Sequence, residues 1–334
     1  MINNIIMTNI QLPNTVQYES YDLHLIPNIN TFEFDGIVDI KFKVTENMDE
    51  IVLNAKDLHI SSAYIKIDSH DLITSIYPIN NRLDIEKEQV IFTFNPNILN
   101  KGVKGILSIR FKGIVNDKMV GLYKSEYASP LSHNNSLLDK YCLVTQFEPT
   151  GARGMFPCAD NPSFKATFNI KISVPSNKKL TVLSNTSVKN MTDDNITKVY
   201  EFNETPIMSS YLLAIFIGKM DYIETTAILP KFNKHVKLRV YTPLGKQSSG
   251  IFSLELVKRV LIYFSEYFDI DYPLDKLDLI GLPDFAAGAM ENWGLITFRS
   301  RLLYVDENTS KKTRESVASV VCHELAHQWF GNLV

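Results

Sequence analysis

The residues with the clearest catalytic potential lie near the end of the chain, where His323, Glu324 and His327 form a His-Glu-x-x-His pattern. In a helix, residues four apart lie one turn apart on nearly the same face, so both imidazoles can reach one metal ion. Glu324 lies about 100° around the helix from His323, close enough to hold a metal-bound water without ligating the metal. The pattern therefore predicts two zinc ligands, His323 and His327, and a general base, Glu324.

The opposite side of this expected helix is an apolar stripe that would attach the helix to a core, formed by Val321, Leu325 and Trp329. An alternative interpretation of the pattern is a buried helix with two hydrogen-bonded histidines and an unrelated glutamate. A second motif favours the catalytic interpretation.

This second motif is Gly288-Ala289-Met290-Glu291-Asn292-Trp293-Gly294, which begins 35 residues before His323. Together the two motifs resemble the signatures of the M1 family of zinc aminopeptidases. A third block, Thr145 to Arg153 and Phe156 to Asp160, looks like the segment that precedes the first signature in the cytosolic, puromycin-sensitive branch. The resemblance covers nearly the whole chain, from about Tyr18 to Val334.

The resemblance implies roles for further residues. Glu291 would bind the free α-ammonium of a peptide, with help from Glu148, and Gln146 would line the same subsite. The remaining residues of the second motif would contact the substrate backbone or subsite: Gly288, Ala289, Met290 and Asn292. Without the resemblance, Glu291 could be an exposed turn carboxylate, and Gln146 and Glu148 could belong to the wet face of a strand.

The expected reaction is release of single residues from peptide N-termini. Zinc lowers the pKa of a bound water to about 7, and Glu324 can take its proton and deliver it to the leaving amine. The resemblance also implies a third zinc ligand, a Glu near position 346, and an oxyanion-stabilising tyrosine beyond it. Both would lie past Val334, so the 334-residue chain by itself is expected to be an inactive fragment.

The composition is that of an ordinary globular protein, with a net charge of −3. This charge gives no reason to expect nucleic acid or an anionic membrane as a partner. Three cysteines are too few for a disulfide framework, and Met1 to Pro13 has neither the charge nor the apolar run of a signal peptide or anchor. A cytoplasmic protein that acts on peptides with a free N-terminus is expected.

Apolar and polar residues alternate through much of residues 1–219, as in strands with one buried face. The clearest runs are Val38 to Val44, Leu107 to Phe111 and Phe168 to Val174. Tyr211 to Ile217 is continuously apolar and predicts a strand covered on both faces. The expected fold of residues 1–219 is a mainly β sandwich or saddle domain.

Helical spacing begins in residues 220–334, where Leu254, Val257, Leu261, Phe264 and Phe268 recur on one face. Strands are predicted at 236–241, 277–281 and 294–298, and a last helix from about Thr313. This order predicts the N-terminal half of a thermolysin-like α/β zinc peptidase domain, as the resemblance also implies.

Three other interpretations remain. A thermolysin-like endopeptidase would not need Glu291 and Glu148 as an amine clamp, and a non-catalytic β-sandwich module could bind peptide termini or a partner protein. The aminopeptidase and epoxide-hydrolase branch of the same family is a minor option, which Ala289 and the Trp293-Gly294 ending do not favour.

Overall fold

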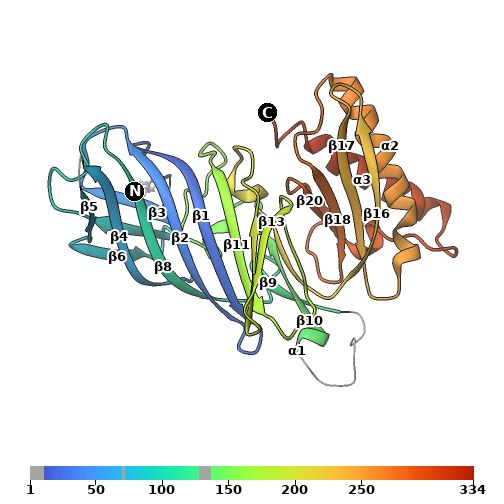
Figure 1. Ribbon diagram of the computed structural model, residues 1–334, viewed down its shortest axis with the longest axis horizontal. Coiled ribbons are helices and arrows are strands. Elements are labelled where there is room, and N and C mark those ends of the chain that lie inside the picture. Colours follow the sequence, from blue (N-terminus) through green and yellow to red (C-terminus); the bar gives the residue numbers. More distant parts are fainter. Residues whose placement is uncertain (1–10, 70–71, 128–136) are drawn as a thin grey trace, which may run out of the picture.

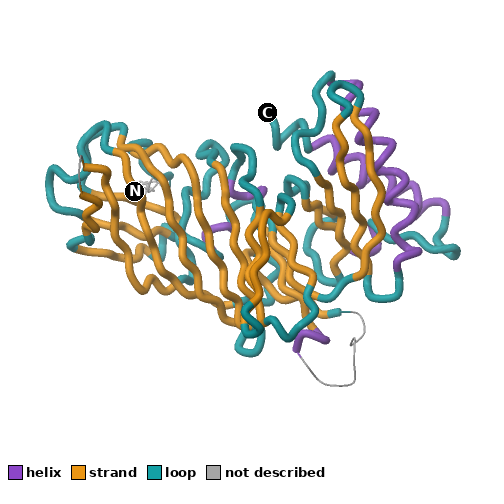
Figure 2. Tube along the Cα trace, in the orientation of Figure 1, coloured by secondary structure: helices purple, strands orange, loops and turns teal. Residues whose placement is uncertain are grey.

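The computed structural model describes residues 11–69, 72–127 and 137–334. Within these residues the strands form four sheets, and two long helices lie near the C-terminal end (Figures 1 and 2). No helix in this part of the chain is long and apolar enough to cross a membrane.

The N-terminal part is built around an eight-stranded sheet with the order β13-β14-β11-β1-β2-β8-β4-β5. Its strands are β1 (Val16–Asn28), β2 (Glu33–Val44), β4 (His59–Ser69), β5 (Leu72–Ile76), β8 (Lys104–Ile114), β11 (Thr167–Pro175), β13 (Val188–Asp193) and β14 (Thr197–Phe202). Most neighbours are antiparallel, but β1 and β11 are parallel.

Two smaller sheets accompany the large one. The first has the order β3-β7-β6 and consists of β3 (Glu50–Asn54), β6 (Asn80–Asp84) and β7 (Gln89–Thr93). The second has the order β12-β15-β10-β9 and consists of β9 (Gly121–Glu126), β10 (Tyr141–Gln146), β12 (Thr181–Ser184) and β15 (Ile215–Gly218), with the short helix α1 (Leu137–Lys140) before β10.

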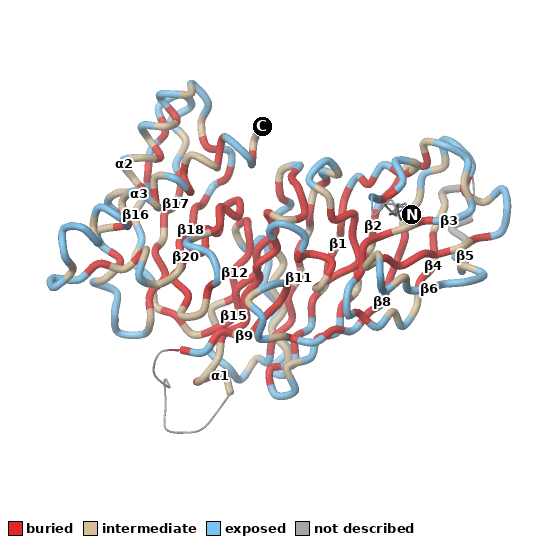
Figure 3. The backbone as a smooth tube through the Cα atoms, turned by 180° about the vertical axis from the view of Figure 1, so that it is seen from behind, coloured by how far each residue is buried: buried red, intermediate tan, exposed pale blue. Residues whose placement is uncertain are grey.

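The predicted alternation in this part is confirmed. The apolar residues of β2, β8 and β11 alternate with more exposed polar residues and are at most 3% exposed: Val38, Ile40, Phe42, Val44, Leu107, Ile109, Phe111, Phe168, Ile170, Ile172 and Val174. Figure 3 shows buried positions recurring along the strands of this sheet. A single inward face therefore carries the core, as expected for a sheet that is wet on its other side.

The prediction of one strand over Tyr211 to Ile217 is wrong in its extent. The strand β15 covers only Ile215–Gly218, and a 3₁₀ turn (Ser210–Leu212) precedes it. The physical reason is Asn185, whose Nδ2 donates to Leu212 O (2.7 Å) and whose Oδ1 accepts from Ala214 N (3.0 Å). One side-chain amide thus satisfies backbone groups that a longer strand would have paired in a ladder.

The C-terminal part contains a five-stranded sheet with the order β16-β17-β18-β20-β19. Its strands are β16 (Asp221–Leu229), β17 (Lys234–Thr242), β18 (Lys276–Leu282), β19 (Ala289–Met290) and β20 (Leu295–Arg299). The strands β17, β18 and β20 are parallel neighbours. They confirm the three strands predicted in this region.

Two helices pack beside this sheet, on its side away from the eight-stranded sheet (Figure 1). They are α2 (Ile251–Phe268) and α3 (Lys311–His327). The Ser310 side chain caps α3 by accepting a hydrogen bond from Thr313 N (3.1 Å). The mainly β N-terminal part followed by an α/β part confirms the predicted fold class. The predicted boundary after residue 219 falls between β15 and β16, in different sheets, and stays a prediction.

Candidate active site

The helix α3 brings the two histidines of the first motif together. The Nε2 atoms of His323 and His327 are 3.2 Å apart, and their rings are nearly perpendicular at 86°. Two nitrogens bound to one tetrahedral zinc at about 2.05 Å would lie roughly 3.3 Å apart. The Nδ1 of His327 is 2.9 Å from Phe330 O, an acceptor, so it carries the proton and leaves Nε2 free as a ligand. The pair therefore fits two corners of a zinc site.

The opposite face of α3 is buried, as the apolar stripe predicts. Val321 and Leu325 have no exposed surface, and Trp329 is 3% exposed. The Trp329 ring packs against Phe264 and Phe268 of α2, and its Nε1 donates to Ile270 O (2.9 Å). This packing fixes the direction in which α3 presents its histidines.

The described residues supply only part of a metal site. Among them, no group of three or more His, Cys, Asp or Glu side chains is arranged to hold a metal ion. The donor set seen here is thus the His323 and His327 pair.

Three glutamates gather beside the histidines. Burial, followed by the charges of Glu291 and Glu148, raises the pKa of Glu324 to about 8. Burial and the charge of Glu291 also raise the pKa of Glu148, while His327 opposes this shift. The charges of Glu291 and Glu148 thus act on Glu324, so these three side chains belong to one electrostatic cluster.

Gln146 adds an unpaired acceptor at the end of β10, two residues before Glu148. Its side chain is 7% exposed, and its Oε1 is buried without a hydrogen-bond partner among the described residues. A buried carbonyl oxygen without a donor costs about 1–3 kcal/mol, so the oxygen is suited to a donor that arrives with a ligand.

The second motif forms the turn and edge strand that carry Glu291. Ala289 and Met290 form β19, which pairs with β20. Met290 and Asn292 are buried, and Asn292 Nδ2 donates to Thr297 Oγ1 (3.3 Å). Gly288 is exposed and Ala289 half-buried. Met290 and Asn292 therefore lie beneath the surface of this turn.

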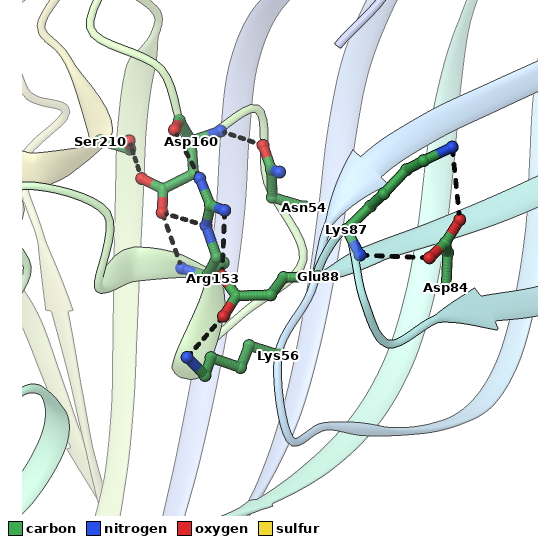
Figure 4. A network of polar contacts seen from close by, with 8 residues as sticks. All are labelled: Asn54, Lys56, Asp84, Lys87, Glu88, Arg153, Asp160 and Ser210. Atoms are coloured by element: carbon green, nitrogen blue, oxygen red, sulfur yellow. Dashed lines mark hydrogen bonds and ion pairs between the residues drawn. The ribbon is translucent and has the colours of Figure 1, made fainter. Parts of the chain in front are cut away.

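A buried ionic network holds the segment that follows Glu148 (Figure 4). Arg153 is 8% exposed, and its guanidinium contacts Asp160 Oδ2 (3.0 Å) and Glu88 Oε2 (3.1 Å). Asp160 Oδ1 in turn accepts from Ser210 Oγ (2.8 Å), and Asp160 N donates to Asn54 Oδ1 (3.1 Å). The network links the third sequence block to the small β3-β7-β6 sheet and to the turn before β15.

Two side chains hold the backbone of the second motif: Asn185 from the N-terminal part and Lys276 from β18. Asn185 Nδ2 donates to Trp293 O (2.9 Å), and Lys276 Nζ donates to both Gly294 O (2.7 Å) and Ser184 O (2.6 Å). Lys276 is 2% exposed and pairs with Asp278 Oδ2 at 2.9 Å. Sequence reasoning missed Asn185 and Lys276, although a lysine and an aspartate inside the apolar 276–282 run were a usable signal of a buried ion pair.

A substitution at Gly294 can test how closely the second motif packs against Asn185 of the N-terminal part. It has a φ of +80°, and a Cβ added there would lie 2.0 Å from Asn185 O. We expect Gly294→Ala to lower the free energy of unfolding by about 3 kcal/mol or more, through backbone strain and the collision. Chemical denaturation of the 334-residue chain measures this change.

Gly245→Ala is the matched control, because Gly245 has a similar φ of +72° but nothing within 4 Å of an added Cβ. Gly245→Ala should lower the free energy of unfolding only by the backbone strain, about 1–2 kcal/mol. Equal losses for the two variants would show that Gly294 does not sit against the N-terminal part as described.

A helix that offers two imidazoles to one metal, with a buried carboxylate between them in sequence, defines a candidate metallohydrolase centre. Comparison with known sequences agrees: the Peptidase M1 N-terminal domain matches residues 17–212, and the Peptidase family M1 domain matches residues 252–334. The chain belongs to peptidase family M1.

Its relatives are named aminopeptidases. The chain is 42% identical to aminopeptidase M1-A of Oryza sativa subsp. japonica over 97% of its own length and 35% of the relative's. It is 40% identical to aminopeptidase 2, mitochondrial, of Saccharomyces cerevisiae, and 39% identical to the puromycin-sensitive aminopeptidase of Caenorhabditis elegans, covering 97% of itself and 32% and 33% of those proteins. The chain thus spans about a third of the length of these relatives.

Proposed function

We propose that the chain forms the N-terminal part of a zinc aminopeptidase that removes single residues from peptides with a free N-terminus. The observation that carries the proposal is that the charges of Glu148 and Glu291 act on Glu324 of the first motif. Gln146, two residues before Glu148 in the chain, adds a buried Oε1 without a hydrogen-bond partner among the described residues. An α-ammonium has three N–H donors and a positive charge, which match these groups in number and sign.

The proposed roles follow from this placement. His323 and His327 would hold zinc, which when bound supplies the Lewis acidity that activates water and the peptide carbonyl. Glu324 would take a proton on its carboxylate from the attacking water and pass it to the leaving amine. Its burial and its position between the histidines in sequence support this role.

We assign substrate binding to residues of the second motif and of the third sequence block. Glu291 and Glu148 would bind the ammonium group, with Gln146 accepting a further N–H. Gly288 and Ala289 would contact the peptide directly, whereas the buried Met290 and Asn292 would support the subsite from within.

The proposal is tested with one peptide in two forms, with and without an N-terminal acetyl group. The enzyme would be a chain that continues through the rest of the catalytic domain, as in the relatives. We expect kcat/KM for the free-amine form to exceed that of the acetylated form by at least about a hundredfold, since acetylation removes the charge that the acceptors bind. Equal cleavage of both forms would identify an endopeptidase, and absence of both cleavage and bound zinc would favour a non-catalytic peptide-binding module.

The compartment and the domain boundary are also proposals. Three free cysteines support a reducing compartment such as the cytoplasm, although one relative is named mitochondrial. The change of sheet between β15 and β16 supports a boundary after residue 219. The net charge of −3 supports peptides, rather than nucleic acid or a membrane surface, as partners.

A further inference from the structure

We propose that Gln328 and Asn332 are positioning residues that hold Glu291 at a fixed distance from the histidine pair and so determine which peptide bond is cleaved. The inference rests on the proposed function, because it concerns the same amine-binding glutamate. It assigns a role to two side chains outside the sequence motifs.

Both side chains reach the same atom. Gln328 Nε2 is 3.1 Å from Glu291 O, and Asn332 Nδ2 is 2.9 Å from it. The two amides have at most 1% exposed surface. A backbone carbonyl oxygen has two lone pairs, so these two donors use its full capacity.

The donors are tied to the residues that would do the chemistry. The second bond of Gln328 Nε2 goes to Glu324 O (3.1 Å), so one NH₂ group joins the carbonyls of Glu324 and Glu291. The backbone N of Asn332 donates to His327 O (3.2 Å). Gln328 through its side chain, and Asn332 through its side chain and backbone together, therefore connect Glu291 to the His-Glu-x-x-His motif.

The side-chain oxygens of Gln328 and Asn332 indicate that these residues serve as hydrogen-bond donors. Gln328 Oε1 and Asn332 Oδ1 are buried without a hydrogen-bond partner among the described residues. A buried amide that uses only its NH₂ group bears the cost of an unpaired oxygen. The two hydrogen bonds to Glu291 O offset the cost of leaving these oxygens unpaired.

A fixed distance matters because an aminopeptidase must measure one residue from the end of its substrate. One residue of extended chain spans about 3.3–3.6 Å, so even a 1 Å shift of the amine-binding group misplaces the scissile carbonyl. Asn185 and Lys276 hold the carbonyls of Trp293 and Gly294 independently. Loss of the two side-chain hydrogen bonds to Glu291 O should therefore shift Glu291 without releasing the rest of the second motif.

The test replaces each amide by an apolar side chain of similar size in a chain that carries the complete catalytic domain. Gln328→Met and Asn332→Leu each leave one donor on Glu291 O, and the double variant leaves none. The measured quantity is the ratio of kcat/KM for a free-amine peptide to kcat/KM for its acetylated form. We expect this ratio to fall about 3- to 10-fold in the single variants and at least about 30-fold in the double variant.

Three further readouts separate positioning from a loss of structure. Zinc content should stay at the parent level, and the dipeptide fraction among the released products should rise. Asn116→Leu is the matched control, because Asn116 Nδ2 also donates to two backbone carbonyls, Val120 O and Leu122 O, outside the site. It should leave the ratio unchanged. If the double variant does not fold, the single variants carry the same comparison.

The outcomes are distinguishable. A parent enzyme that cleaves both peptide forms equally contradicts the proposed function itself. A parent that prefers the free amine, with variants that lose both activities in proportion or lose zinc, overturns only the positioning role of Gln328 and Asn332.

Discussion

Glu324→Gln should retain zinc yet lose about 10²–10⁴-fold in kcat, in a chain that continues through the rest of the catalytic domain. The amide has nearly the shape of the carboxylate, but it cannot accept a proton from water. Zinc should stay bound because Glu324 is not among its ligands: the nitrogens that face each other at 3.2 Å belong to His323 and His327. Metal analysis of the purified variant and steady-state kinetics on a free-amine peptide measure the two effects.

His323→Ala and His327→Ala provide the contrast. Each removes one of two imidazoles that fit a tetrahedral ion, so zinc and activity should be lost together. If Glu324→Gln lost zinc as readily as the histidine variants, the assignment of base and ligands would be wrong.

Glu291→Ala is the second substitution with a large expected effect. It should lower kcat/KM for free-amine substrates by at least about a hundredfold, or roughly 3 kcal/mol. The reason is that a substrate ammonium placed beside the buried Glu291 would lose its main counter-charge. The acetylated form of the same peptide has no ammonium, so its slow cleavage should change little.

Glu148→Ala should act in the same direction but more weakly, since Glu291 remains to hold the amine. The pKa of Glu148 is raised by burial and then by the charge of Glu291, so Glu291 already acts on Glu148. A Glu291→Ala variant that lost activity equally on both peptide forms would contradict amine binding and indicate a general structural role.

The sequence by itself determined the features that depend on local periodicity. A period of two defines the buried faces of β2, β8 and β11, because alternate side chains of a strand point to opposite faces. A spacing of four places His323 and His327 on one face of α3, because a helix turns about 100° per residue. The assignment of Glu291, Glu148 and Gln146 to one site came from the family resemblance and from no periodicity, and it stays a prediction.

Only the tertiary structure decided what holds these residues together. Asn185 and Trp293, or Glu291 and Asn332, are far apart in the chain, and no periodicity marks a side-chain amide that binds a distant carbonyl. The same long-range contact of Asn185 shortened the strand predicted at Tyr211 to Ile217, because a buried backbone group takes whichever partner the fold brings near. Local sequence thus determined which strand faces are buried and how α3 pairs its two histidines, and long-range packing decided which distant segments hold these elements together.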